Sequence, residues 1–110
     1  MRSAMMQALM IQTTTATEAD AETIAEELLA EGLAACVQIA AIRSRYVWKG
    51  EVQREAEQLL SIKTRADLWE PVRARIRALH SYEAPEVIAL PVTDIDPDYL
   101  AWVEGVTRRP

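Results

Sequence analysis

Apolar and polar positions along the chain follow two periods, one typical of strands and one typical of helices. Residues 8–15 form an apolar run that ends in three threonines, as in a buried strand. Thr17 then has the side chain of a helix N-cap, with Asp20 placed as in a variant of the capping box. Apolar residues at the spacing of one helix face are Ala21, Ile24, Ala25, Leu28 and Leu29. The pattern predicts a strand followed by an amphipathic helix that ends at Gly32.

The middle of the chain predicts a long β-hairpin. Residues 35–48 are rich in β-branched and aromatic side chains, Lys49-Gly50 provides a tight reversal, and residues 53–64 return with alternating apolar positions. Because the two runs are longer than a small sheet needs, we expect the tip to extend past the core. Apolar residues near the tip, such as Tyr46 and Trp48, favour pairing with another subunit.

A second amphipathic helix follows the hairpin. Asp67 and Glu70 are placed to cap its N-terminus, and Pro71 falls in or just after its first turn, where a missing N–H group costs little. Its predicted buried stripe consists of Val72, Ile76 and Leu79. Arginines at 73, 75 and 77 give this helix a basic face, whereas the first helix carries an acidic one. The two helices are therefore expected to lie side by side.

The last part of the chain predicts a strand and a third helix. The strand covers residues 86–92, with Pro91 at its end or on a sheet edge. Asp96-Pro97 marks the start of a short helix that should end before Gly105. The order β-α-β-β-α-β with a terminal helix predicts an α+β, ferredoxin-like fold, in which a four-stranded antiparallel sheet carries two helices on one face.

Length and charge limit the class of protein. A chain of 110 residues is the size of one domain. We expect that domain at residues 8–106, between a flexible extension at 1–7 and a tail at 107–110. The net charge of −5 argues against a nucleic-acid or anionic-membrane partner. The single cysteine suits a reducing compartment, and no apolar run reaches the length of a membrane span, so we expect a cytoplasmic protein.

Residues with reactive or ligating side chains gather where the second helix gives way to the last strand. With one histidine and one cysteine in the chain, no metal cage of the usual His/Cys multiplicity can form within one subunit. His80 either neutralises a helix C-terminus or serves as a metal ligand or proton carrier. Glu83 and Glu86 are either turn acceptors or ligands of a hard cation. Glu57 is either edge-strand charge or a partner of His80 at a cleft between subunits.

Other candidates are assigned to contacts rather than catalysis. Lys63 should lie on the sheet face away from Ile62, where an interface salt bridge is favoured over a catalytic amine. Tyr46, Trp48 and Trp102 are assigned to a subunit contact or a ligand cleft. The sequence has no Gly-rich phosphate loop, no Ser/His/Asp set and no CxxC motif, so we do not expect an enzyme.

Five ordered motifs resemble the CutA family of divalent-cation tolerance proteins. They are Ala34-Ala35-Cys36-Val37, Ser44-x-Tyr46-x-Trp48-Lys49-Gly50, Leu60-x-Ile62-Lys63-Thr64, His80-x-Tyr82-Glu83-x-Pro85-Glu86 and Tyr99-Leu100-x-Trp102. The resemblance implies a ferredoxin-like fold, a homotrimer built through the long hairpins, a cytoplasmic location, and tolerance of copper and other divalent ions. Members proposed to bind copper have a cysteine and a second histidine at positions that match Thr13 and Leu79 here, so only His80 remains of that set.

These observations leave three functional hypotheses. The first is a non-enzymatic trimer that binds Cu(II) or another divalent cation at inter-subunit clefts lined by His80, Tyr82, Glu83 and Glu57. The second is a module similar to the PII-type signalling proteins, which would bind a small anion through Lys63, Arg43 and Arg45. The third is a trimeric scaffold that presents its surface to a protein partner.

Overall fold

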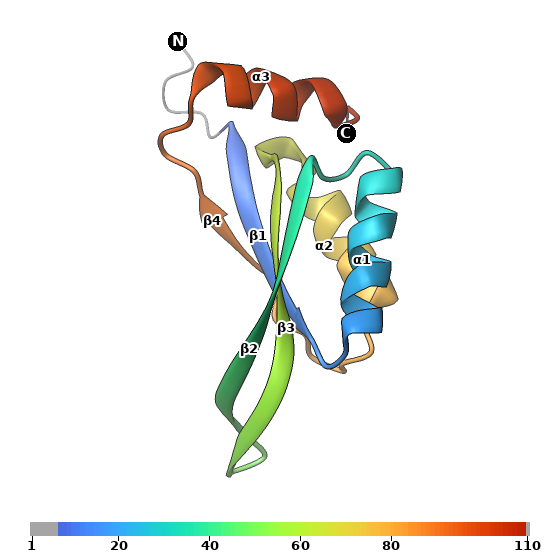
Figure 1. The fold of residues 1–110 in the computed structure, drawn as a ribbon, viewed down its shortest axis with the longest axis vertical. Coiled ribbons are helices and arrows are strands. Elements are labelled where there is room, and N and C mark those ends of the chain that lie inside the picture. The colour runs from blue at the N-terminus through green and yellow to red at the C-terminus, as the bar shows by residue number, and fades with distance from the viewer. Residues whose placement is uncertain (1–6, 110) are drawn as a thin grey trace.

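The computed structural model describes residues 7–109. Its elements are β1 (Ala8–Thr15), α1 (Glu18–Ala30), β2 (Cys36–Trp48), β3 (Glu51–Arg65), a 3₁₀ turn (Ala66–Leu68), α2 (Trp69–Leu79), β4 (Ile88–Pro91) and α3 (Pro97–Val106). The strands form one antiparallel sheet in the order β2-β3-β1-β4. Helices α1 and α2 lie side by side on one face of the sheet, and α3 crosses one end of it (Figure 1). The predicted ferredoxin-like α+β fold is confirmed.

The hydrophobic core lies between the two paired helices and one face of the sheet. Its fully buried members include Ile11 on β1, Leu60 and Ile62 on β3, Ile24 and Leu28 on α1, and Val72 and Ile76 on α2. Because side chains alternate along a strand, residues 59, 61 and 63 of β3 face the opposite side. Lys63 therefore points away from the core, as predicted. Leu29, which we placed on the buried face of α1, is instead 42% exposed.

Helix α1 begins and ends as its sequence predicts. The side chain of Thr17 accepts a hydrogen bond of 3.1 Å from the backbone N–H of Asp20. At the other end Gly32 has φ +68°, a left-handed conformation that glycine adopts without a steric penalty. The backbone N–H of Leu33 then reaches the carbonyl of Leu28 at 2.9 Å, which completes a Schellman C-cap.

The start of α2 differs from the prediction. Asp67 does not cap the helix, because its carboxylate accepts a 2.6 Å hydrogen bond from the guanidinium of Arg65. Glu70 pairs with Arg73 one turn later, and α2 begins at Trp69 without a side-chain cap. The predicted placement of the acidic helix beside the basic one is confirmed, and Arg75 of α2 donates to Glu31 at 2.9 Å and to Glu27 at 3.3 Å.

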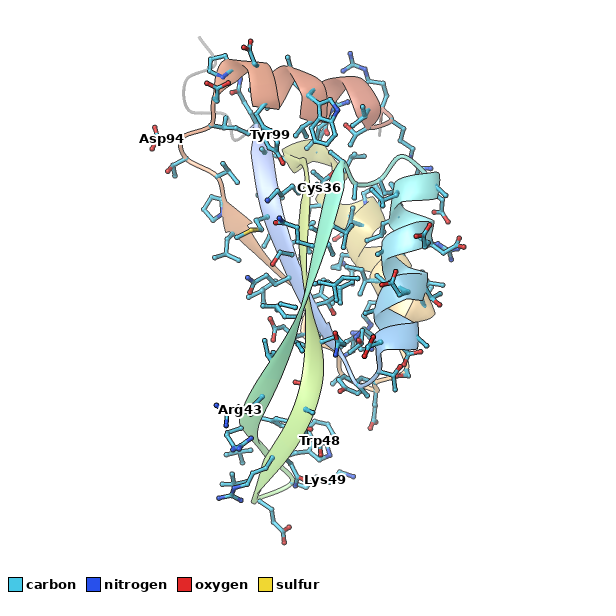
Figure 2. The ribbon with its side chains drawn as sticks, in the orientation of Figure 1. Cys36, Arg43, Trp48, Lys49, Asp94 and Tyr99 are labelled. Carbon is cyan, nitrogen blue, oxygen red and sulfur yellow. The ribbon has the colours of Figure 1, made fainter. Side chains whose placement is uncertain are left out.

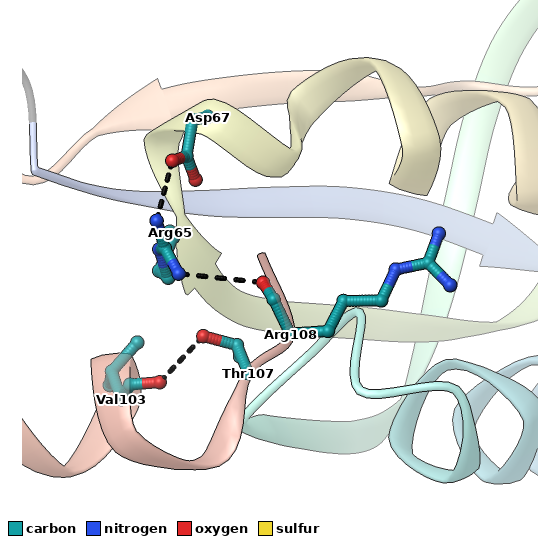
Figure 3. Close-up of polar contacts among 5 residues, drawn as sticks. All are labelled: Arg65, Asp67, Val103, Thr107 and Arg108. Atoms are coloured by element: carbon teal, nitrogen blue, oxygen red, sulfur yellow. Dashed lines mark hydrogen bonds and ion pairs between the residues drawn. The ribbon is translucent and has the colours of Figure 1, made fainter. Parts of the chain in front are cut away.

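The C-terminal segment is tied to the rest of the domain (Figure 3). The guanidinium of Arg65 donates to the carbonyl of Arg108 at 3.4 Å, and the Arg108 N–H donates to the carbonyl of Gly32 at 2.8 Å. Thr107 Oγ1 donates to the carbonyl of Val103 at 2.8 Å. The predicted tail at 107–110 is thus anchored at its first two residues. Helix α3 runs through Gly105 to Val106, one residue past the glycine that we expected to follow it.

The hairpin of β2 and β3 extends well past the paired helices (Figure 1). Its strands stay in register from Cys36 opposite Lys63 to Trp48 opposite Glu51. Lys49 and Gly50 both have positive φ, 53° and 82°, as a type I′ turn requires. At the far edge of the sheet, β4 is shorter than the predicted strand at 86–92, and Pro91 is its last residue, as predicted for an edge.

Two further predictions were a flexible N-terminal extension and a chain without a membrane span. Most of the extension predicted at 1–7 lies outside the described residues. Among residues 7–109, no helix combines the length and the apolar character needed to cross a membrane.

Candidate functional site

A cleft of about 710 Å³ separates the distal half of the hairpin from the segment that joins α2 to β4. Its walls are formed by Thr14, Ser44, Arg45, Tyr46, Trp48, Glu57 and residues 81–86. Figure 2 shows Trp48 towards the tip of the hairpin, at the opposite end of the molecule from Cys36 and Tyr99. The cleft brings together seven of the candidate residues named from the sequence, which are Arg45, Tyr46, Trp48, Glu57, Tyr82, Glu83 and Glu86.

His80 follows the last residue of α2, and its side chain makes two hydrogen bonds. Ring Nε2 lies 2.7 Å from the carbonyl oxygen of Thr14, and ring Nδ1 accepts from the backbone N–H of Tyr82 at 3.1 Å. A carbonyl oxygen can only accept and a backbone N–H can only donate, so the tautomer with its hydrogen on Nε2 satisfies both partners. In this arrangement neither ring nitrogen has a lone pair free for a metal ion.

Tyr82 connects this histidine to Glu57. Its phenolic O–H donates to Glu57 Oε2 at 2.6 Å, and its ring centroid lies 4.9 Å from that of His80. Burial raises the pKa of Tyr82 well above its ordinary value, and the hydrogen bond to Glu57 and the charge of Glu57 raise it further. Tyr82 therefore stays a proton donor at neutral pH and holds the carboxylate in place.

The segment between α2 and β4 is also attached to α1. Ser81 Oγ donates to Asp20 Oδ2 at 3.2 Å. The Asp20 carboxylate, which we expected to complete a capping box, thus accepts a hydrogen bond from this segment. Together with the Thr14–His80 contact, this bond fixes the loop wall of the cleft to two earlier elements.

The predicted metal ligands do not complete a coordination sphere within one subunit. Glu57 is 6% exposed and Glu83 is exposed, and both line the cleft. Within residues 7–109, no three side chains of histidine, cysteine, aspartate or glutamate converge as a metal ion needs. With both nitrogens of His80 engaged, a divalent ion in this cleft would need further ligands from a second subunit.

Two other predicted residues lie away from the cleft. Lys63 Nζ donates to Gln38 Oε1 at 2.7 Å within its own subunit, and the interface salt bridge that we expected for it stays a prediction. Lys63 lies opposite Cys36, and Arg45 lies about 30 Å further along β2 at the usual rise of a strand. The cations of the hypothetical anion site are therefore not gathered within one subunit. Trp102 lies on α3, 46% exposed, with its ring centroid 5.5 Å from that of Tyr99.

Thr14 is a site residue that sequence reasoning missed. Its carbonyl fixes the His80 ring, and its residue lines the cleft. It belongs to a run of three threonines at the end of a buried strand, and nothing in their spacing distinguishes Thr14 from Thr13 or Thr15. Only the antiparallel register, which sets Thr14 opposite Leu59 on the face away from the helices, places it at the cleft.

Comparisons with known proteins agree on one family. The family model of the CutA1 divalent ion tolerance protein matches residues 9–106. A chloroplastic CutA protein of Arabidopsis thaliana is 47% identical over 87 residues, which are 78% of this chain and 48% of the relative, so the chain spans about half the length of that plant protein. The divalent-cation tolerance protein CutA of Thermus thermophilus is 41% identical over 95 residues, 86% of this chain and 92% of the relative. The crystal structure of CutA1 from Oryza sativa superimposes with a TM-score of 0.92 at 38% identity, covering 96% of this chain and 97% of that one.

Proposed function

Because this chain belongs to the family of CutA1 divalent ion tolerance proteins, we propose that it acts in the response to divalent metal ions as a cytoplasmic, non-enzymatic homotrimer. The observation that supports the proposed trimer is the exposed end of the hairpin. Val47 is 70% exposed and Val52 is 55% exposed, and they lie opposite each other near the tip of the hairpin, which extends past the subunit's own helices (Figure 1). Apolar side chains gathered on a protruding ribbon favour a subunit contact.

We place the proposed metal site at the cleft because a buried carboxylate and an exposed one both line it. Glu57 and Glu83 supply oxygen ligands, and neighbouring subunits of the trimer would complete the set. His80 joins only if its ring gives up the hydrogen bond to Tyr82. Cu(II) is the proposed ion, since imidazole and carboxylate suit it.

The test is a calorimetric titration of Cu(II) into the assembled protein and into three variants. Glu57→Gln removes a carboxylate in the cleft, His80→Gln removes the imidazole, and Glu22→Gln removes an equal charge on the exposed face of α1. The proposal expects weaker binding for Glu57→Gln and unchanged binding for Glu22→Gln. Equal binding by wild type and His80→Gln would remove the histidine from the site, and equal binding by all four proteins would remove the site itself.

Two further outcomes separate the rival functions. Normal tolerance in cells that carry a Glu57→Gln, Glu83→Gln, His80→Gln triple variant, with an intact trimer, would favour the scaffold over the metal site. A rise in melting temperature with nucleotides or organic anions, absent with metal ions, would favour the anion-binding module. Fractionation of the source cells tests the proposed location, since recovery in any compartment other than the cytoplasm contradicts it.

A further inference from the structure

The cleft combines aromatic rings with an excess of negative charge. Its lining includes the rings of Tyr46, Trp48 and Tyr82 and the carboxylates of Glu57, Glu83 and Glu86, against the single guanidinium of Arg45. The Arg45 guanidinium itself donates to the backbone carbonyl of Ser44 at 3.0 Å. A volume of about 710 Å³ is in the range of small-molecule sites. The cleft therefore suits a small ligand with positive charge and some apolar surface.

Glu57 is the residue of the cleft that most favours a positively charged ligand. Its side chain is buried, with 6% of the residue exposed, and its hydrogen-bond donor is the neutral phenol of Tyr82. The ion pairs among residues 7–109 use Glu27, Glu31, Asp67 and Glu70, and none of them reaches Glu57. A buried carboxylate without a cationic partner is unfavourable, and a positive group in the cleft removes that cost.

The aromatic rings decide between kinds of cation. An organic ammonium ion can place its alkyl part against the rings of tryptophan and tyrosine while its charged nitrogen meets a carboxylate, whereas a hydrated divalent ion needs several converging oxygen ligands. The Trp48 ring already has one ammonium group nearby, because Lys49 Nζ lies 5.9 Å from its centroid, within reach of a cation–π contact. Burial, with added effect from the charges of Glu55 and Glu57, also raises the pKa of Tyr46, so this phenol stays neutral beside those carboxylates.

We propose that the cleft binds a small organic ammonium ion, with its charged nitrogen at the Glu57 carboxylate and its alkyl part against Trp48 and Tyr46. Tyr82 acts as a positioning residue, because its O–H holds the Glu57 carboxylate from one side and leaves the other side for the ligand. The inference concerns the same cleft as the proposed metal site but does not rest on metal binding.

The test uses n-butylammonium chloride as the probe and calorimetry on the full-length protein. Its neutral isostere 1-butanol and an equal concentration of sodium chloride serve as ligand controls. Glu57→Gln keeps an oxygen acceptor for Tyr82 and removes the charge, so we expect binding at least about tenfold weaker, as for the loss of a charge-assisted contact. Glu22→Gln changes the net charge equally on an exposed helix face and should bind as wild type does.

A second variant keeps the proposal falsifiable if Glu57→Gln does not fold. Trp48→Leu removes the aromatic face and should weaken butylammonium binding while leaving Cu(II) binding unchanged. Absence of saturable butylammonium binding, equal binding of butanol, or unchanged binding in both Glu57→Gln and Trp48→Leu overturns the inference. Loss of Cu(II) binding alone affects only the proposed metal site.

Discussion

Replacing Thr13 by valine is expected to stabilise the protein, although Thr13 is fully buried. Its Oγ1 has no hydrogen-bond partner among the described residues, while its side chain faces the core opposite Leu60. Valine has nearly the same shape as threonine, so the substitution leaves the packing in place and removes only the unpaired hydroxyl. A buried polar group without a partner costs about 1–3 kcal/mol, and we expect Thr13→Val to recover about 1–2 kcal/mol of that.

Thr64 provides a matched control on the same face of the sheet. It is also fully buried, but its Oγ1 donates to the carbonyl of Leu33 at 2.6 Å. Thr64→Val makes the same chemical change where the hydroxyl is paired, and so should destabilise the protein by about 1 kcal/mol. The pair of variants thus predicts shifts of opposite sign from one kind of substitution.

The assay is urea unfolding of wild type and both variants at one protein concentration, because assembly makes stability depend on concentration. Thermal unfolding gives a second reading, with about 4–8 °C expected per kcal/mol for a domain near this size. Loss of stability in Thr13→Val equal to that in Thr64→Val would refute the reasoning, because it would mean that the Thr13 hydroxyl has a partner in solution.

Three other changes test the anchors of the fold and of the cleft. Arg65→Leu removes the donor to Asp67 and to the Arg108 carbonyl, and should lower the free energy of unfolding in urea by about 2–3 kcal/mol. Asp67→Asn changes only the half-exposed partner, and should lower it by less than half as much. Gly32→Ala should cost about 1–2 kcal/mol, because φ is +68° and a Cβ would lie 3.3 Å from the Arg108 nitrogen. Gly105→Ala, in open space on α3, should gain about 0.5–1 kcal/mol, and a loss at Gly105 as large as that at Gly32 would contradict this account. Because the pKa of Tyr82 is raised in the folded protein, the unfolded chain loses the phenol proton first as the pH rises above 10, and the stability that the buried phenol contributes below pH 10 is lost at higher pH. Above pH 10 the free energy of unfolding should therefore fall less steeply with pH in Tyr82→Phe than in wild type. Identical slopes for the two proteins would count against the burial of this phenol.

The sequence predicted the bounds of those elements whose ends depend on residues close by in the chain. The strand at Ala8–Thr15, the Thr17 cap and the Lys49-Gly50 reversal all have the bounds that the pattern indicates. These features depend on backbone preferences and on hydrogen bonds across a few residues, which the order of residues specifies directly.

Errors arose where a distant or stronger partner competed with the local one. Asp67 has the spacing of an N-cap, but the guanidinium of Arg65 offers a charge-assisted bond that a backbone N–H does not match. The last strand is shorter than the apolar run from 86 to 92 because it pairs with only four residues of β1. The anchoring of Arg108 depends on Gly32 and Arg65, both far away in sequence.

Tyr46, Trp48, Glu57, Tyr82 and Glu83 of the cleft were named from the sequence, whereas Thr14 and the contacts among these residues were not. The cluster at 80–86 and the exposed hairpin residues identified one wall each of what became a single cleft. The pairing of Tyr82 with Glu57, and the use of both His80 nitrogens, depend on how the joining segment packs beside the sheet. No periodicity in the sequence encodes that packing, so the choice between a ligand and a structural histidine needed the structure.

The most direct measurement is the mass of the purified protein by sedimentation equilibrium, for wild type and for a variant that combines Val47→Asp and Val52→Asp. If the protruding hairpin joins the subunits, wild type sediments at three times the 12.3 kDa chain mass and the variant shifts to the single chain with its fold retained. A wild-type protein that sediments as a single chain across the concentration range would contradict the assembly and, with it, a metal site completed by neighbouring subunits.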